Sequence, residues 1–412
     1  MAVTSIGKDL AMIPLDAIRT AAEKLKHHII WTPIIHSSTL SQRIGADVYL
    51  KLENLQKTGS FKVRGATYKL IRQRNAIGPG GVVTASAGNH AQGVALAARE
   101  TGVPATVVMP EWASITKQEA TRSYGGDVVI YGTSIDESLE KARALSREGR
   151  MFIHPFDDED IVTGQGTMGL EIFEDIPDAD MILVPIGGGG LISGIASAAR
   201  GIRPETDVIG VEAAVCPSAS ESRKIGKVTR VAACASIADG ISVKQVGDLC
   251  FAMLQEAVAD VVLVEEEHIT AAMLMLLERK RILAEGSGAA PLAALLNGSV
   301  VPPAGGKVVL VISGGNVDSP LLGRIISQGL LKHGRIMRLR VLLEDIPGAL
   351  AGMLAAVARQ KANVLTIYHD RRVRGIPITE TLVELELETR GPEHAEAVAE
   401  DLRREGYEIT VR

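Results

Sequence analysis

Short apolar runs alternate with segments of helical periodicity along most of the chain, and this alternation limits the possible folds more than any other feature. The runs lack polar alternation, so each is expected to form a strand that is buried on both faces. The predicted strands are 82–85, 105–109, 127–131, 181–185, 208–212 and 307–312, and the predicted helices are 15–27, 91–101, 266–283 and 287–296. Strands of this kind separated by helices are typical of a mostly parallel, layered α/β fold.

The composition agrees with this fold class and narrows the possible partners. Hydrophobic residues make up 46% of the 412 residues but aromatic residues only 3%, so the core must be built from Ala, Val, Ile and Leu. The net charge is −5 and no long run has a single sign, which argues against nucleic acid or an anionic membrane as partner. We therefore expect a cytoplasmic protein that binds small molecules or copies of itself.

The three cysteines and the N-terminal segment add two expectations. Cys216, Cys234 and Cys250 are widely spaced, so we expect buried thiols and neither a disulfide framework nor a structural zinc site. The first twelve residues lack the apolar core of a signal peptide, and no stretch reaches 18 apolar residues.

Beyond Gly334 the pattern changes to alternating strands and amphipathic helices. We expect strand 337–343, helix 345–360, strands 363–369 and 378–389, helix 392–405 and strand 407–412. The order βαββαβ predicts a ferredoxin-like module whose antiparallel sheet has one open face. Such a face favours pairing with another copy or with a ligand, and the domain boundary is expected at 330–336.

Three glycine-rich turns follow predicted strands. The run of four glycines at 187–190 comes directly before a helical segment, where converging backbone N–H groups and the helix dipole favour a phosphate; a plain flexible turn is the alternative. The segment 86–93, SAGNHAQG, is suited to a carboxylate, and its Asn89 amide could hold a ligand oxygen. His90 fits a structural hydrogen bond better than a catalytic base. A third turn, SGGN, occupies 313–316.

The segment 164–169, GQGTMG, matches the dinucleotide-binding fingerprint only as a bare pattern. The residues before it are polar and acidic and do not form the strand that the fingerprint requires. We interpret it as a helix start that lines an interdomain cleft.

Lys62 lies among small and apolar residues with Arg64 nearby, and by itself it fits a surface lysine as well as a nucleophile. A lysine amine together with three glycine turns matches the needs of pyridoxal 5′-phosphate (PLP). This cofactor requires an amine, a backbone cradle for its phosphate, and partners for its O3′ and ring nitrogen.

The motifs SFKxRGA, SAGNHAQG, GGGGL and SGGN occur in the order seen in the serine/threonine dehydratase family. Over residues 10–330 the chain resembles the threonine dehydratases of this family, which are fold type II PLP enzymes with two lobes of mostly parallel three-layer α/β structure. The resemblance implies a catalytic domain over 1–330, with a smaller lobe at about 50–155. Residues 337–412 resemble an ACT domain, a module that commonly binds amino-acid effectors.

The resemblance assigns roles residue by residue. Lys62 would carry the cofactor, Phe61 would pack beside its ring, Asn89 would bind O3′, and Ser313 would face the ring nitrogen. The phosphate would be held by backbone N–H groups of Gly187, Gly188, Gly189, Gly190 and Leu191. A hydroxyl facing the ring nitrogen, unlike a carboxylate, does not keep that nitrogen protonated, which favours loss of a β-substituent over transamination.

The implied reaction is the β-elimination of L-threonine to 2-oxobutanoate and ammonia, with L-serine giving pyruvate. Lys62 would also remove the Cα proton. The residues expected near the substrate are Ser86, Ala87, Gly88, Asn89, His90, Gly240 and Glu285.

Two positions separate the chain from related activities. Serine racemases of this fold carry a serine at the position of Ala87, and alanine cannot move a proton, so racemisation should be weak. Those relatives also bind a divalent ion through a glutamate and a downstream acid. After Glu212 the next acid is Glu221, so no metal is expected.

The sequence leaves several alternatives open. The enzyme could prefer L-serine or threo-3-hydroxyaspartate, or the chain could be an amino-acid sensor with a retired catalytic domain. Isoleucine or valine is the expected effector at a subunit interface of a homodimer or homotetramer, in either isoleucine biosynthesis or threonine catabolism. The effector residues would be Asp345, Ile346, Pro347, Gly348, Ala349, Leu350 and Asn363.

Overall fold

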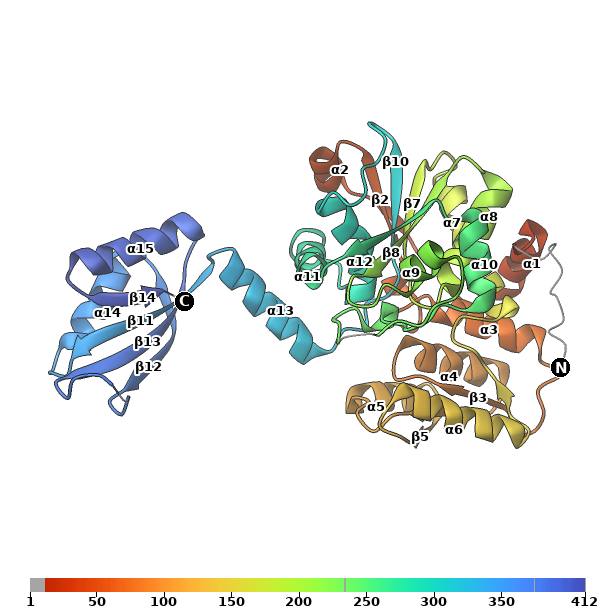
Figure 1. The fold of residues 1–412 in the computed structure, drawn as a ribbon, viewed down its shortest axis with the longest axis horizontal. Helices are drawn as coiled ribbons and strands as arrows, with labels where there is room; N and C mark the ends of the chain where they lie inside the picture. Colours follow the sequence, from red (N-terminus) through yellow and green to blue (C-terminus); the bar gives the residue numbers. More distant parts are fainter. Residues whose placement is uncertain (1–11, 233–234, 374, 412) are drawn as a thin grey trace. The chain divides into compact units, whose positions relative to one another are not determined.

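The computed structural model describes residues 12–232, 235–373 and 375–411. The chain divides into two compact units, Met1–Asp318 and Ser319–Arg412 (Figure 1). Helix α13 (Ser319–Lys332) is grouped with the second unit, which therefore begins before the segment 330–336 at which the sequence predicts the boundary.

The first unit contains two sheets. The larger has the order β1-β2-β10-β7-β8-β9, and only β1 runs antiparallel to its neighbour. Its strands are β1 (Ile34–His36), β2 (Asp47–Leu52), β7 (Met181–Pro185), β8 (Asp207–Ala213), β9 (Asp260–Val264) and β10 (Lys307–Ile312). The smaller sheet has the order β5-β4-β3-β6 and is entirely parallel: β3 (Val82–Ala85), β4 (Ala105–Met109), β5 (Asp127–Ile130) and β6 (Met151–Phe152). The predicted mostly parallel α/β fold is confirmed.

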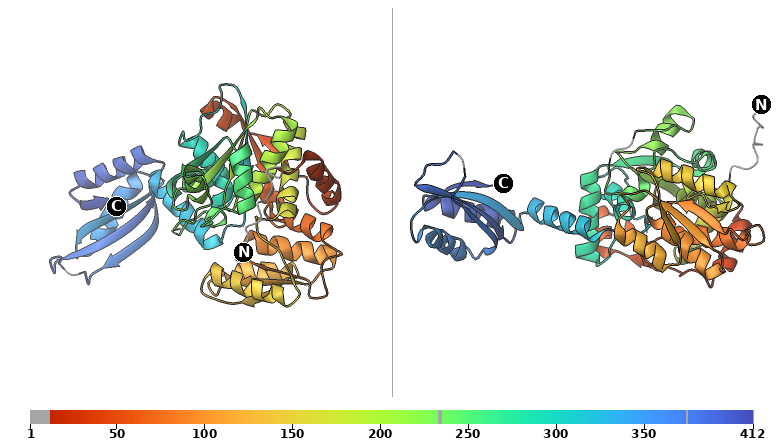
Figure 2. Two further views of the ribbon diagram at one scale, coloured as in Figure 1. Left: turned by 45° about the vertical axis from the view of Figure 1, so that its right-hand side comes forward. Right: turned by 90° about the horizontal axis from the view of Figure 1, so that it is seen from below.

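Helices connect and cover these strands (Figures 1 and 2). They are α1 (Leu15–Leu25), α2 (Ser38–Ile44), α3 (Lys62–Arg72), α4 (Asn89–Thr101), α5 (Ile115–Ser123), α6 (Ile135–Arg147), α7 (Glu159–Asp175), α8 (Gly190–Ile202), α9 (Ser218–Ile225), α10 (Asp248–Ala257), α11 (Glu266–Met275) and α12 (Gly286–Leu296). The helix predicted over 266–283 ends early: α11 passes into a π-helical turn, η3 (Leu276–Lys280), and Arg281 is left-handed with φ 59°. For a residue other than glycine this conformation marks a helix end.

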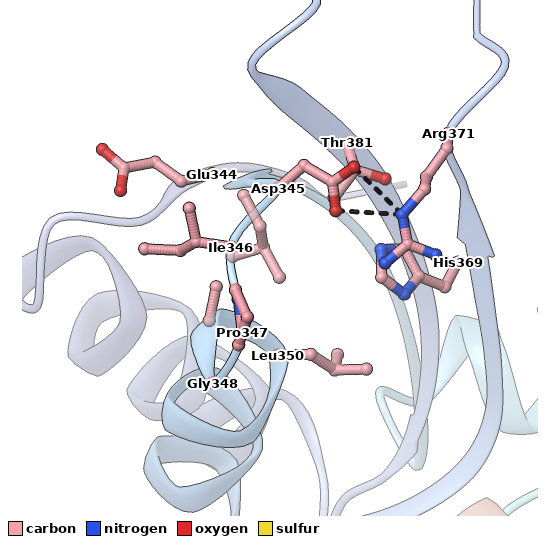
Figure 3. Close-up of a pocket in the computed structure, with 11 residues that line it drawn as sticks. Glu344, Asp345, Ile346, Pro347, Gly348, Leu350, His369, Arg371 and Thr381 are labelled. Atoms are coloured by element: carbon pink, nitrogen blue, oxygen red, sulfur yellow. Dashed lines mark hydrogen bonds and ion pairs between the residues drawn. The ribbon is translucent and has the colours of Figure 1, made fainter.

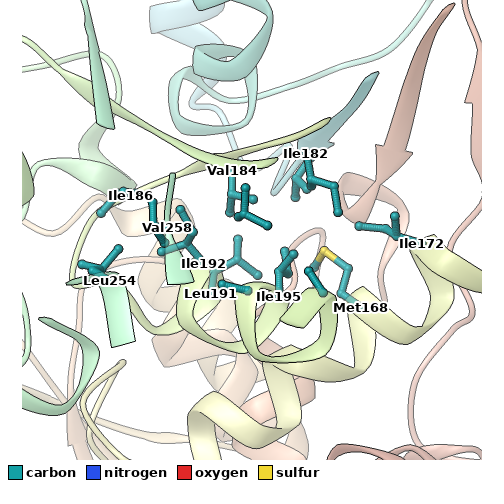
Figure 4. Close-up of a cluster of buried hydrophobic side chains, with 14 of the residues drawn as sticks. Met168, Ile172, Ile182, Val184, Ile186, Leu191, Ile192, Ile195, Leu254 and Val258 are labelled. Atoms are coloured by element: carbon teal, nitrogen blue, oxygen red, sulfur yellow. The ribbon is translucent and has the colours of Figure 1, made fainter. Parts of the chain in front are cut away.

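A buried cluster between β7 and α8 fixes the carboxyl end of β7 (Figure 4). Side chains of the strand and the following residue pack with those of the helix: Ile182, Val184 and Ile186 with Leu191, Ile192 and Ile195. All six are at most 5% exposed. On β8, a side chain at Gly210 would overlap Ile186, so glycine leaves the room this packing needs.

The glycines of GQGTMG lie in the middle of a helix, so the prediction that they start one was wrong. Helix α7 begins at Glu159, and the Asp158 side chain caps it by accepting the backbone N–H of Asp160 at 2.9 Å. A Cβ at Gly164 would lie 2.7 Å from Gly65 Cα on α3, and one at Gly166 would lie 3.0 Å from the Gly194 carbonyl on α8. These glycines allow close helix packing and do not line a ligand cleft.

The second unit has the element order that the sequence predicts. After α13 come β11 (Ile336–Glu344), α14 (Ala349–Arg359), β12 (Asn363–Asp370), β13 (Glu380–Glu388), α15 (Pro392–Arg404) and β14 (Glu408–Val411). The antiparallel sheet has the order β12-β13-β11-β14, which confirms βαββαβ. One correction concerns α14: it begins at Ala349 and not at 345, because Gly348 is left-handed with φ 95° and forms a turn before the helix.

Three further observations concern the described residues alone. Cys216 and Cys250 are buried, whereas Cys234 lies outside the described residues. In the described ranges, no helix combines the length and the apolar character that a membrane span requires. The same ranges contain no group of three or more His, Cys, Asp or Glu side chains arranged to hold a metal ion.

Candidate active site

Lys62 is the first residue of α3 and is half-buried. Its Nζ donates a hydrogen bond to the Pro155 carbonyl at 2.9 Å and lies 5.1 Å from the centre of the Phe61 ring. Burial lowers the pKa of Lys62 to about 8, against the opposing effect of Cys250 and Glu285. The amine is therefore partly neutral near pH 8, as a nucleophile or proton acceptor must be.

The glycine loop, residues 187–190, lies beside this lysine. It joins β7 to α8, and Gly189 has φ 97°. The first N–H groups of a helix lack acceptors within it, so the start of α8 can bind an anion. A side chain at Gly188 would overlap the ring of Phe156, which directly follows the residue whose carbonyl holds Lys62 Nζ. The backbone of residues 187–190 and the Lys62 amine therefore border the same small region.

Gly240 borders the same region from another segment. A Cβ at Gly187 would lie 3.0 Å from the Gly240 carbonyl, and one at Gly240 would lie 2.7 Å from Ser287 Oγ. The structure therefore places Gly240 between the glycine loop and the start of α12.

Asn89 begins α4 at the carboxyl end of β3 and takes part in a hydrogen-bonded network. Its Nδ2 donates to Glu285 Oε1 at 2.7 Å, and its Oδ1 accepts from Asn316 Nδ2 at 2.8 Å. Burial raises the pKa of Glu285 to about 7, and Asp239 adds to the shift. A Cβ at Gly314 would lie 2.6 Å from Glu285 Oε1, so the 313–316 turn must be bare there.

Ser313 and Phe61 connect this network to the lysine. The Phe61 N–H donates to the Ser313 carbonyl at 3.1 Å, and Ser60 pairs with Gly314 as an isolated antiparallel bridge. Ser313 is 2% exposed. The chain segment leading to Lys62 therefore runs along the end of β10.

The predicted substrate loop, residues 86–90, follows β3. Its Gly88 N–H donates to Ser86 Oγ at 3.2 Å, and Ala87 is half-buried. His90 is buried, with Nε2 3.4 Å from the Ile153 carbonyl. Burial, together with the charge of Lys62, lowers the pKa of His90 to about 3, so its imidazole is neutral.

Sequence reasoning missed Asn316 and a group of four buried charges. Arg64 donates to Glu53 at 2.7 and 2.8 Å and to Glu171 at 2.6 and 2.9 Å, and Lys51 also pairs with Glu171. Asn316 stands in the SGGN turn and could have been singled out by its place beside the glycines. No spacing signal connects Glu171 to Arg64, because 107 residues separate them.

The second unit contains a cavity of about 340 Å³ (Figure 3). It is lined by Leu343, Glu344, Asp345, Ile346, Pro347, Gly348, Ala349, Leu350, His369, Arg371 and Thr381. Arg371 Nε donates to both Asp345 carboxylate oxygens, at 2.9 and 3.0 Å. The structure thus brings together the predicted residues 345–350. Asn363 is not among the lining residues, and its Nδ2 donates to Glu388 at 3.3 Å.

The geometry of the first unit fits PLP. Among the described residues, the hydroxyls of Ser60 and Ser287 are buried without a hydrogen-bond partner, and both border the region between Lys62 and Glu285. At residues 187–190 a Cβ would meet Gly240, Phe156 or Cys250, so only bare backbone fits there, and its N–H groups at the start of α8 suit a phosphate. A unit of this construction suits an enzyme that works through a phosphorylated cofactor, with Lys62 as the candidate residue for its attachment.

Comparison with known proteins specifies the class. A family model described as "Pyridoxal-phosphate dependent enzyme" matches residues 25–314. The chain belongs to this family, whose members use PLP, and its α/β unit with two parallel sheets has the fold type II arrangement.

Three similar proteins illustrate the range of activities in the family. An L-threonine ammonia-lyase of Thermotoga maritima is 46% identical over 97% of this chain and 100% of its own length. A threonine deaminase structure from Solanum lycopersicum is 36% identical with a TM-score of 0.72, covering 76% of this chain and 92% of that one. Maize serine racemase is 34% identical with a TM-score of 0.73, covering 77% and 98%.

Proposed function

We propose that the chain is a carbon–nitrogen lyase that converts L-threonine to 2-oxobutanoate and ammonia, and L-serine, as a side reaction, to pyruvate. The observation that carries the proposal is the placement of Lys62, whose pKa is lowered to about 8, beside the glycine loop at 187–190. The 46% identity with an L-threonine ammonia-lyase over nearly the whole chain supports the choice of substrate.

The residues around the cofactor have distinct proposed roles. Lys62 carries PLP, Phe61 packs beside the ring, and the Asn89 amide donates to O3′. The backbone N–H groups of residues 187–191 hold the phosphate at the start of α8. The Ser313 hydroxyl faces the ring nitrogen, and as a neutral group it leaves this nitrogen unprotonated.

When bound, PLP withdraws electron density from the substrate Cα and so makes the Cα proton removable. Lys62 takes that proton in its neutral form; with a pKa of about 8, about one tenth of the amine is neutral at pH 7 and half at pH 8. Residues 86–90 hold the substrate carboxylate through loop N–H groups, while Gly240 and Glu285 border the substrate. His90 stays neutral at working pH and supports the loop without moving a proton.

Ala87 argues against racemisation as the main reaction, although maize serine racemase has a similar fold. Racemisation needs a second group that moves a proton on the opposite face of Cα, and a methyl group has no transferable proton. Deamination needs one proton acceptor at Cα, which Lys62 supplies, and one proton donor for the departing β-hydroxyl, which the phosphate of the cofactor would supply so that the hydroxyl leaves as water.

The proposal is tested by measuring kcat/KM of the holoenzyme for L-threonine, L-serine and threo-3-hydroxyaspartate. We expect the highest value for L-threonine; a higher value for either other substrate reassigns the substrate. Release of no keto acid from any of the three would support the retired-domain alternative. Borohydride reduction followed by peptide mapping should place the cofactor on Lys62 and not on the exposed Lys57, five residues earlier.

We also propose that the second unit is an ACT domain that binds isoleucine or valine in the cavity formed by residues 345–350. The cavity has the opposite charges of Asp345 and Arg371 on its wall, which suit an amino acid's ammonium and carboxylate groups (Figure 3). Asn363, predicted from the resemblance, belongs to the same proposal through contacts with a second subunit in a cytoplasmic homodimer or homotetramer.

Titration calorimetry on the full-length protein tests the effector. Isoleucine or valine should bind, and Asp345→Ala should weaken binding, whereas Asp401→Asn on α15 serves as the matched control. Inhibition of threonine deamination by isoleucine would indicate a role in isoleucine biosynthesis. Absence of binding by both amino acids in the wild-type protein would contradict the proposal.

A further inference from the structure

The amide of Asn89 can be placed in two ways that differ by a 180° rotation, and only one suits its proposed role. A carboxamide has an oxygen that accepts and an NH2 group that donates. The O3′ of bound PLP needs a donor, so the NH2 group must point toward it. With the rotated amide, two oxygen acceptors would face each other. The hydrogen-bond partners of Asn89 decide which orientation the protein maintains.

Asn316 determines one side of the Asn89 amide. Its Nδ2 lies 2.8 Å from the Thr58 carbonyl and 2.8 Å from Asn89 Oδ1. A backbone carbonyl can only accept, so Asn316 must present its NH2 group to Thr58, and the second hydrogen of that group is then directed at Asn89. Asn89 must therefore present its oxygen to Asn316.

The position of Asn316 is itself fixed by the backbone around it. A Cβ at Gly59 would lie 2.5 Å from Asn316 Oδ1, and Gly59 has φ 72°, so only glycine leaves room for the amide. The Gly315 N–H donates to the Gly59 carbonyl at 2.9 Å and ties the two turns together. Asn316 is thus held in one orientation by the main chain.

Glu285 determines the other side. Its Oε1 accepts one hydrogen of Asn89 Nδ2 at 2.7 Å, and the residue is 6% exposed at the start of α12. Above its pKa of about 7 the Glu285 carboxylate is ionised and only accepts, so it then also selects the NH2 group. The second hydrogen of Asn89 Nδ2 is left for another acceptor, and Gly314, whose Cβ would lie 3.2 Å from that nitrogen, keeps the approach open.

We propose that Asn316 and Glu285 are positioning residues that hold the Asn89 amide with its NH2 group toward the O3′ of bound PLP. Neither needs to touch the cofactor; both act through Asn89. The inference rests on the proposed role of Asn89, and the variants below separate a failure of that role from a failure of the inference.

The principal variant is Asn316→Asp, which keeps the size of the side chain but removes its NH2 group. The new carboxylate cannot donate to Asn89 Oδ1, and it attracts the Asn89 NH2 group instead, so Asn89 rotates and turns its oxygen to O3′. We expect the dissociation constant for PLP to rise about 10- to 100-fold, as for a buried hydrogen bond left unmade. The visible absorption maximum of the bound cofactor should shift.

Asn54→Asp is the matched control. Asn54 also donates to a backbone carbonyl, that of Leu283 at 3.1 Å, and a Cβ at Gly315 would lie 3.1 Å from its Cβ. Asn54 takes no part in the hydrogen bonds that join Asn89 to Glu285 and Asn316. We expect the affinity for PLP and the absorption maximum to change little in this variant.

The double variant Asn316→Asp with Glu285→Gln distinguishes positioning from general support of the fold. The new amide can donate to the oxygen of the rotated Asn89, which restores complementary pairing between residues 89 and 285, although the carboxylate at 316 still faces the Thr58 carbonyl. The melting temperature of the apoprotein should therefore recover in part, while the weak binding of PLP and the shifted absorption persist. Glu285→Gln alone should weaken the binding of PLP less than Asn316→Asp does, because Asn316 still sets the orientation and an amide oxygen can accept from Asn89.

The outcomes separate the two proposals. If Asn89→Ala leaves PLP affinity and absorption unchanged, the proposed role of Asn89 fails. If Asn89→Ala changes both but Asn316→Asp does not, the positioning inference is wrong. Recovery of absorption together with melting temperature in the double variant would also overturn it, since a purely structural role predicts that the two recover together.

Discussion

Two groups of four charges, one in each unit, show how differently the two parts of the chain use ion pairs. In the first unit, Lys51, Glu53, Arg64 and Glu171 are at most 4% exposed and connect β2, α3 and α7. In the second unit, Arg338 pairs with Glu386 at 2.5 Å and Arg340 pairs with Glu384, across β11 and β13 on the solvent-facing side of the sheet.

The difference lies in what each arrangement costs when it is broken. A buried charge without its partner is strongly unfavourable, so a buried group with balanced charges holds its elements in one geometry. Exposed pairs exchange contacts with water at little cost. Arg64 lies two residues after Lys62 on the same helix, so the buried group fixes the helix that carries the lysine proposed to bind the cofactor.

Lys62→Ala has the largest expected effect on activity. It should lower the rate of deamination without lowering the stability of the protein, whereas Arg64, on the same helix, should matter for stability. Deamination of L-threonine should fall at least about 10³-fold, because both cofactor attachment and proton removal are lost. The apoprotein should not lose stability, since burial of the amine lowers its pKa and disfavours its charged form. Steady-state kinetics and urea unfolding measure the two effects, and keto-acid release that survives the substitution contradicts the mechanism.

Arg64→Met tests the buried group directly. It leaves Glu53 and Glu171 with Lys51 as the one remaining cation of the group, and the first unit should lose about 3–5 kcal/mol. Both tryptophans of the chain, Trp31 and Trp112, lie in this unit, so tryptophan fluorescence during urea unfolding reports on it alone. A loss below about 1 kcal/mol would show that the buried and exposed groups are equivalent.

The buried Glu212 carboxylate should make the stability of the first unit depend on pH. It accepts the N–H groups of Ala219 at 2.7 Å and Ser220 at 2.9 Å, yet burial raises the pKa of Glu212 to about 7. The folded state then binds the proton more tightly than the unfolded state, so the contribution of Glu212 to stability is fully present below about pH 4.5 and is lost as the pH rises to about 7. The contribution is about 3 kcal/mol.

Glu212→Gln should reduce this decline without abolishing it, because the pKa of Glu285 is raised to about 7 as well. Urea midpoints from tryptophan fluorescence at pH 5 and pH 7.5 measure the difference. An unchanged decline in the variant would mean that Glu212 does not titrate in this range.

Arg338→Gln has the smallest expected effect. The Arg338 and Glu386 side chains are 52% and 30% exposed, so the second unit should lose at most about 1 kcal/mol. Circular dichroism follows the whole chain, while the tryptophan transition should not move. A loss comparable to that of Arg64→Met would break the contrast between the two units.

The sequence predicted the strands best where they are buried on both faces. β3, β4, β7 and β10 have the predicted bounds, because proline, glycine or polar residues lie at the ends of each apolar run or within two residues of them. Prediction was poorer where tertiary packing overrides the local preference of glycine for turns and helix ends. The glycines at 164–169 lie inside a helix because α3 and α8 pack closely against them. The predicted site residues follow the ends of strands, where the sequence motifs and the fold indicate the same positions.

The contacts that orient the site could not be predicted in the same way. Asn89 meets Glu285 and Asn316 across 196 and 227 residues of sequence, and no local pattern selects those partners. Of the residues that line the second cavity, His369 lies on β12, Thr381 lies on β13, and Arg371 directly follows β12. The alternating pattern of these strands predicts which side chains share a face, but not which of them lie together. Their position at one end of the sheet depends on strand register, which sequence alone does not give.

The place of β10 has a consequence for how the protein is made. This strand, residues 307–312, is among the last of the first unit to be synthesised, yet it lies between β2 and β7 in the middle of the large sheet. A nascent chain can complete its smaller sheet early, whereas its large sheet stays split until about three quarters of the protein has been translated. A message truncated before β10 therefore yields a product whose strands β2 and β7 have no strand between them and which lacks Ser313, the residue proposed to face the ring nitrogen of PLP.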